Sequence, residues 1–92
     1  MRTIQINYDL SVPGRNYEAV ETYIKSLGGW CHLLESLWLV RTWKTASDVR
    51  DELKAIVHTK DKVATFDVTG VPWATNFTAD TTTWMHRNMR AA

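Results

Sequence analysis

The chain has 92 residues, of which 45% are hydrophobic and 23% are charged, and eleven Lys and Arg against ten Asp and Glu give a net charge of +1. This length suits one domain, and no apolar run approaches the ~20 residues of a membrane span. The charge balance gives no global signal for nucleic acid or for a cationic partner. A single cysteine, Cys31, excludes an intrachain disulfide and a multi-cysteine zinc site, so we expect a cytoplasmic protein that does not enter a membrane.

Two elements are predicted before residue 30. Residues 3–8 alternate polar and apolar, which indicates a half-buried strand. Its core-facing residues are Ile4, Ile6 and Tyr8. Residues 16–27 carry apolar side chains three or four apart, which predicts an amphipathic helix that Gly28-Gly29 ends. These side chains are Tyr17, Val20, Ile24 and Leu27.

The next segment is predicted to be a hairpin, with strands at about 30–34 and 37–43 joined by a tight turn at Glu35-Ser36. In the second strand Trp38, Val40 and Thr42 share one face. The opposite face carries Leu37, Leu39, Arg41 and Trp43. Both faces are therefore expected to be at least partly covered.

The remaining core elements are a second helix and a fourth strand. Either Thr45 or Ser47 can cap the helix, whose apolar stripe is Val49, Leu53, Ile56 and Val57. Residues 63–69 alternate again as a strand, and its core side is predicted to be Ala64, Phe66 and Val68.

The order βαββαβ predicts an α+β, ferredoxin-like domain over residues 1–92, with a four-stranded antiparallel sheet and two helices on one face. Residues 1–70 form the core, and 71–92 are a Trp-rich C-terminal extension with a short helix near 80–89. The extension is too apolar for a free end, so we expect it to dock on the sheet edge or on a partner subunit. The open sheet face should form a dimer interface, since Leu37, Leu39 and Trp43 would otherwise be an exposed apolar patch.

Few residues suggest chemistry. The three histidines lie in different elements without metal-site spacing, which favours local hydrogen bonding over metal binding. The five tryptophans suit a small core and a dimer interface, or stacking platforms for unpaired bases near Arg41 and Lys44. Asp9 ends the first strand, where it can form a turn or bind Mg²⁺ that keeps several waters. One carboxylate makes a weak metal site, whereas two across a dimer axis make a plausible one.

Several motifs resemble a known family. They are Tyr8-Asp9-Leu10, Pro13-Gly14, Asn16-Tyr17 and the set Ser36, Trp38, Val40 and Thr42. Over roughly residues 3–70 the chain resembles the small CRISPR-associated adaptation proteins with a nuclease-type ferredoxin fold, the virulence-associated protein D toxins, and above all their short bacterial and phage relatives.

The resemblance implies a homodimer whose open sheet faces meet, and a metal-dependent phosphodiesterase active on RNA or DNA. The metal-binding role transfers to Asp9, and Ser36 matches the serine of the second motif. The basic run that often follows the Asp is reduced to Arg15, and the extension after residue 70 is outside the nuclease pattern.

Two functions follow as hypotheses. The first is a dimeric Mg²⁺-dependent nuclease, or a nucleic-acid binder derived from one, in which Asp9 holds the metal and Ser36 positions phosphate. Arg15, Arg41 and Lys44 are its candidate nucleic-acid contacts. The second is a non-catalytic phage or mobile-element protein that binds a host protein or a small nucleotide through its Trp-rich surface. Tyr8-Asp9 favours the first hypothesis, and the low net charge favours the second.

Overall fold

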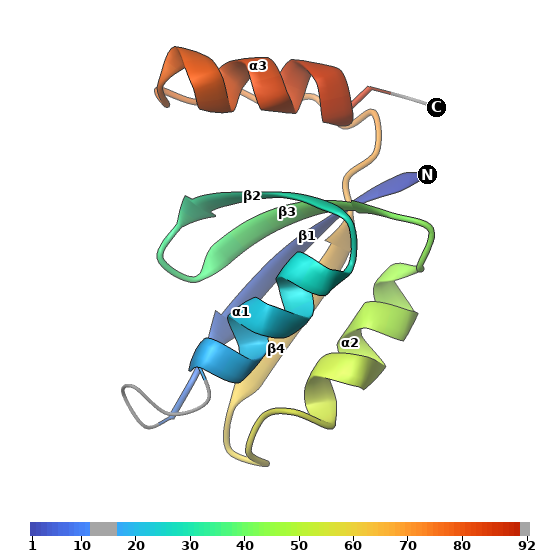
Figure 1. The fold of residues 1–92 in the computed structure, drawn as a ribbon, viewed down its shortest axis with the longest axis vertical. Coiled ribbons are helices and arrows are strands. Elements are labelled where there is room, and N and C mark those ends of the chain that lie inside the picture. Colours follow the sequence, from blue (N-terminus) through green and yellow to red (C-terminus); the bar gives the residue numbers. More distant parts are fainter. Residues whose placement is uncertain (12–16, 91–92) are drawn as a thin grey trace.

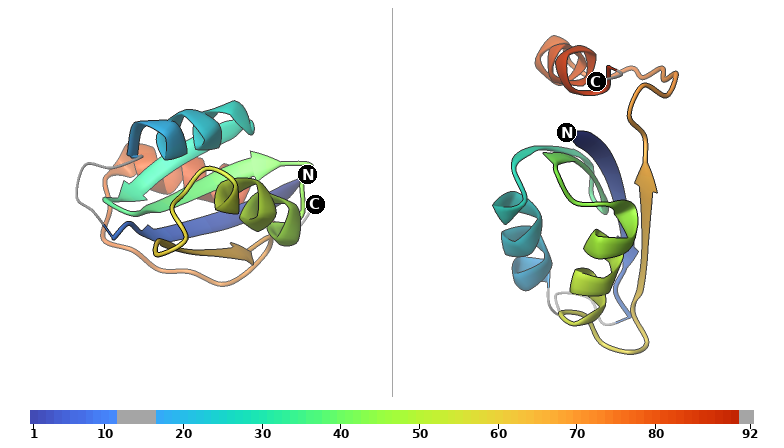
Figure 2. Two further views of the ribbon diagram at one scale, coloured as in Figure 1. Left: turned by 90° about the horizontal axis from the view of Figure 1, so that it is seen from below. Right: turned by 90° about the vertical axis from the view of Figure 1, so that its right-hand side faces the viewer.

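The computed structural model describes residues 1–11 and 17–90 of the chain. Its elements are β1 (Arg2–Asp9), α1 (Tyr17–Ser26), β2 (Gly29–Leu34), β3 (Leu37–Thr42), α2 (Ala46–Lys54), β4 (Lys62–Asp67) and α3 (Ala79–Asn88). The four strands form one antiparallel sheet in the order β2-β3-β1-β4. Helices α1 and α2 lie on one face of the sheet, and α3 lies across the sheet from them (Figures 1 and 2).

The predicted α+β, ferredoxin-like fold is confirmed, since β1 and β3 are the central strands and each βαβ unit is split by the strand between its two ends. The predicted break at Pro13-Gly14 and the predicted helix start at Asn16 lie outside the described residues. None of the helices in the described ranges is long and apolar enough to cross a membrane.

The main core lies between the sheet and helices α1 and α2. Each helix presents an apolar stripe to the sheet, and the buried members of the core are Ile4, Ile6, Tyr8, Leu10, Val20, Ile24, Trp38, Val40, Val49 and Leu53. Helix α2 ends at Lys54, so Ile56 and Val57 follow it and pack against the core from the next turn.

The start of α2 is fixed by a reciprocal capping arrangement. The Thr45 hydroxyl accepts from the Asp48 amide at 3.1 Å, and the Asp48 carboxylate accepts from the Thr45 amide at 3.1 Å. The hydrogen bond from the Thr45 amide lowers the pKa of Asp48. Of the two residues that the sequence allowed as caps, the structure therefore selects Thr45 over Ser47.

Helix α3 and the segment before it cover part of the second sheet face. Leu39, Met85 and Met89 are buried in this second cluster, with Leu33, Val68, Trp73, Phe77 and Trp84 packed around them. At the C-terminal end of α3, the Arg41 guanidinium donates to the Asn88 carbonyl at 2.9 Å. The extension was predicted to dock on the sheet edge or on a partner subunit, and the structure instead places it on the second face of the sheet. The predicted apolar patch is wrong at Leu39, which is 2% exposed because α3 covers it.

The predicted facing of the fourth strand is also wrong. Its core side was expected to carry Ala64, Phe66 and Val68, but the register with β1 places these residues on the opposite face. On the helix side, Thr65 donates its hydroxyl to the Ala46 carbonyl at 2.7 Å. Phe66 is 51% exposed, and Val68 packs in the second cluster, beneath α3. Alternation defines the period of a strand but not its phase, and the phase follows from pairing with β1.

Candidate functional site

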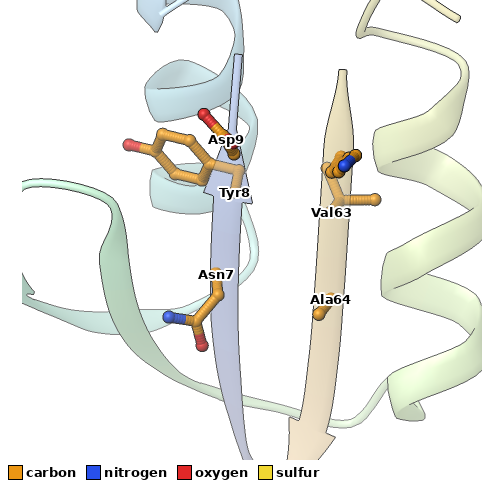
Figure 3. Close-up of a pocket in the computed structure, with 6 residues that line it drawn as sticks. Asn7, Tyr8, Asp9, Val63 and Ala64 are labelled. Atoms are coloured by element: carbon orange, nitrogen blue, oxygen red, sulfur yellow. The ribbon is translucent and has the colours of Figure 1, made fainter. Parts of the chain in front are cut away.

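Asp9 lies at the end of β1, on the sheet face away from α1 and α2, where it is exposed and paired with Lys62 of β4. It lines an open hollow of about 210 Å³ between the ends of these two strands (Figure 3). The remaining lining residues are Asn7, Tyr8, Lys62, Val63 and Ala64. Among the described residues that line the hollow, Asp9 is the only one with a carboxylate, and the ammonium group of Lys62 is its neighbour in the sheet.

Ser36 reaches the same end of the sheet from the β2–β3 turn. The Tyr8 amide donates to the Ser36 carbonyl at 3.2 Å, which places the turn directly beside the end of β1. The Tyr8 hydroxyl donates to the Glu35 carbonyl at 3.4 Å and accepts from the Trp38 indole at 3.1 Å. Asp9 and Ser36, distant in sequence, are therefore brought to neighbouring positions by the antiparallel pairing of β1 with β3.

Tyr8 serves as an anchor in this arrangement. Its ring is 5% exposed, and burial raises the pKa of the phenol, although the hydrogen bond from Trp38 opposes this shift. The phenol therefore stays protonated at neutral pH, and its O–H group can donate the hydrogen bond to the Glu35 carbonyl. Tyr8 in the Tyr-Asp pair therefore fixes the turn that carries Ser36, whereas Asp9 faces solvent on the other side of the strand.

Two of the three predicted nucleic-acid contacts, Arg41 and Lys44, do not lie at this end of the sheet. Arg41 pairs with Thr3 at the opposite end of the sheet, and its guanidinium donates to the Thr3 hydroxyl at 2.8 Å as well as to α3. Lys44 donates to both carboxylate oxygens of Glu52 at 2.7 Å. Arg15 lies outside the described residues. Lys62, which the sequence did not single out, is the cation that the fold places beside Asp9.

The donors needed for a metal site within one chain are not found in the described ranges. Among residues 1–11 and 17–90, no three His, Cys, Asp or Glu side chains lie together in a way that could hold a metal ion. Two of the histidines make local contacts. His58 accepts from the Lys60 amide at 3.2 Å, and His86 packs against Trp73 with ring centres 4.9 Å apart.

A second feature lies on the helix side of the outer strand β2, and we call it the Trp30 platform. It consists of Trp30 and His32 of β2, the buried Trp38 of β3 and Lys25 of α1. The His32 ring stacks on Trp38 at 3.9 Å between centres and 10° between planes. The ammonium of Lys25 lies 4.9 Å from the centre of the Trp30 ring. The platform was not predicted from the sequence. The signal that could have revealed it is the hairpin register, which places His32 opposite Trp38.

No family model matches the chain, and searches of curated proteins and of solved structures return no significant match. The geometry of the site and its chemistry therefore carry the functional argument.

Proposed function

We propose that the protein is a homodimeric, cytoplasmic nucleic-acid-binding protein of nuclease type, in which Asp9 from two copies holds Mg²⁺ and Ser36 positions a phosphate. The observation that supports it best is that Asp9 and Ser36 lie at the same end of the sheet, since the Tyr8 amide donates to the Ser36 carbonyl and Asp9 lines the open hollow there. The sequence resemblance gives the metal-binding role to Asp9 and matches Ser36 to the serine of its second motif.

The donor set suits magnesium only when two chains contribute. Mg²⁺ is commonly bound through one or two carboxylates while it keeps several waters. Each chain offers Asp9 to the hollow, and the neighbouring Lys62 opposes a cation held by one carboxylate alone. When bound, the ion would polarise a phosphoryl oxygen and lower the pKa of a coordinated water. The hydroxyl of Ser36 would donate a hydrogen bond to the phosphate.

The surface for dimer formation is the part of the open face that α3 leaves uncovered. Phe66 is 51% exposed there, and it shares this face of β4 with Ala64 and Lys62. An exposed phenylalanine on a sheet face that also carries Asp9 provides apolar area for a second copy. We therefore expect Phe66→Ser to favour monomers in sedimentation at high micromolar concentration, without lowering the melting temperature at low concentration. A wild type that stays monomeric under these conditions contradicts the dimer.

The catalytic role is tested by cleavage of labelled single-stranded RNA and DNA with Mg²⁺ or Mn²⁺. Asp9→Asn keeps the side-chain shape but removes the charge that a divalent ion needs, so cleavage should be lost and binding retained. Asp51→Asn is the matched control, since Asp51 is an exposed carboxylate on α2. EDTA should abolish the activity. A wild type that cleaves nothing, or an Asp9→Asn variant that cleaves normally, refutes the catalytic role.

One observation favours the second candidate, a non-catalytic phage or mobile-element protein that binds a host protein or a small nucleotide. Arg41 and Lys44 are engaged in internal contacts, so they add little to a phosphate-binding surface at Asp9. Binding of single-stranded RNA at several salt concentrations separates the candidates, because phosphate contacts lose affinity steeply as salt rises. Absence of binding at low salt refutes the nucleic-acid function and leaves a host protein or a small nucleotide as the partner.

A further inference from the structure

The Trp30 platform combines exposed aromatic rings with a positive charge at the edge of the sheet. Trp30 remains 42% exposed and His32 is also exposed, although both lie on the face that α1 and α2 cover elsewhere. Their position on the outer strand β2 explains this exposure, since β2 has no neighbouring strand on its outer side. Exposed aromatic side chains that lie together, rather than singly, mark interaction sites on soluble proteins.

The rings are held in fixed orientations. The Trp38 indole, 1% exposed, is tied to the Tyr8 hydroxyl, and the imidazole of His32 stacks flat on it. Nε2 of His32 lies 3.0 Å from the Glu35 carbonyl oxygen, which restrains rotation of the ring. Trp30 lies against the same indole with ring centres 5.4 Å apart. The Trp30 plane is tilted by 54° to that of Trp38, so it does not continue the plane of His32. A further flat ring can therefore stack on the exposed Trp30 without reordering the side chains beneath it.

Lys25 supplies the charge. Its ammonium lies 4.9 Å from the centre of the Trp30 ring and 5.9 Å from that of Trp38, at the exposed last turn of α1. A lysine carries its charge on a flexible stem, so the ammonium can leave the ring for an anion a few ångströms away. A flat π surface beside a mobile cation matches the two parts of one nucleotide, its base and its phosphate.

We propose that the Trp30 platform binds an unpaired nucleotide of a single strand, with the base stacked on Trp30 and the phosphate contacted by Lys25. This inference rests on the proposed nucleic-acid function, and it names the form of nucleic acid that the protein takes. The platform lies on the helix side of the sheet, whereas Asp9 lies on the other face. It is therefore a binding site separate from the proposed metal site.

The test uses a fluorescently labelled ten-nucleotide single-stranded RNA and measures its affinity by anisotropy at low salt. Trp30→Leu should weaken binding roughly 5- to 150-fold, the range that stacking of a base on one aromatic side chain supplies. Trp30→Tyr keeps a stacking ring and should restore most of the affinity. Lys25→Gln should lower the slope of log affinity against log salt by about one. Trp43→Leu is the matched control, because Trp43 is 73% exposed outside the platform. Each variant is used only when its melting temperature shows that it is folded.

The ligand's source is distinguished by a second arm with a nucleoside monophosphate. If the natural ligand is a single strand, the oligonucleotide should bind at least tenfold more tightly than the mononucleotide. Equal affinities would overturn the single-strand assignment in favour of a small nucleotide. If folded Trp30→Leu binds RNA as tightly as wild type, or if Trp43→Leu loses as much, the platform is not the site, whatever Asp9→Asn shows. If binding depends on Trp30 but no Asp9-dependent cleavage occurs, the platform stands and the catalytic proposal falls. If no RNA binds at low salt, both fall.

Discussion

Truncation of Leu39 should release α3 from the sheet without opening the main core. Leu39 and Val40 are neighbours on β3 but point to opposite faces, so Leu39 lies under α3 and Val40 lies under α1 and α2. Both are almost completely buried, at 2% and 0% exposure. A buried Leu→Ala change costs about 2–5 kcal/mol, and the lower end is expected here because a single covering helix can settle into the space. About 2 kcal/mol corresponds to a roughly 30-fold change in the equilibrium for detachment of α3.

Amide hydrogen exchange measures this equilibrium helix by helix. Amides of α3 should exchange roughly 30-fold faster in Leu39→Ala, because detachment of α3 from this variant breaks fewer side-chain contacts than detachment from the wild type. They should be unchanged in Val40→Ala, because Val40 stays buried when α3 detaches alone. Amides of β1 and α1 should exchange faster in both variants, since global unfolding exposes both side chains. If Val40→Ala accelerates α3 as much as Leu39→Ala does, the two layers unfold as one unit and the reasoning is refuted.

Three further substitutions test local features of the fold. Thr45→Ala removes the cap of α2 and should cost about 1 kcal/mol, or roughly 4–8 °C in melting temperature, whereas Ser47→Ala should cost little. Gly28→Ala should cost about 1–3 kcal/mol, because φ is 150° there and a β-carbon would collide with a carbonyl oxygen of β3. Gly29→Ala meets only ordinary contacts and is its control. The Asp61 carboxylate accepts hydrogen bonds from the amide and the hydroxyl of Ser11 and from the amide of His58. These hydrogen bonds lower the pKa of Asp61 below the usual 3.8. Its stabilising effect is therefore complete above that value and lost as pH falls through the lowered pKa. Asp61→Asn should melt below wild type at pH 7, and the gap should narrow between about pH 5 and pH 2; a constant gap would contradict the assignment.

The amino-acid sequence by itself determined the element order and most of the core. Periodicity identified Ile4 and Ile6 as core residues of β1, and Val20 and Ile24 as the buried stripe of α1, because the solvent-facing and core-facing sides of these elements differ sharply in polarity. Together with the turn at Glu35-Ser36, these patterns are local and sufficient for a βαββαβ order. That order in turn leaves few sheet topologies to choose among.

Tertiary structure decided the features that depend on pairing and on what covers each face. The phase of β4 follows from its register with β1, so Phe66 is exposed, against the prediction from hydrophobicity. The same register places Lys62 beside Asp9. Leu39 is buried by α3, a helix from more than forty residues away along the chain. Proximity of Asp9 to Ser36 and stacking of His32 on Trp38 likewise come from strand pairing. A linear pattern records the polarity that a side chain prefers, whereas its neighbours depend on register and on docking, and these are properties of the folded chain.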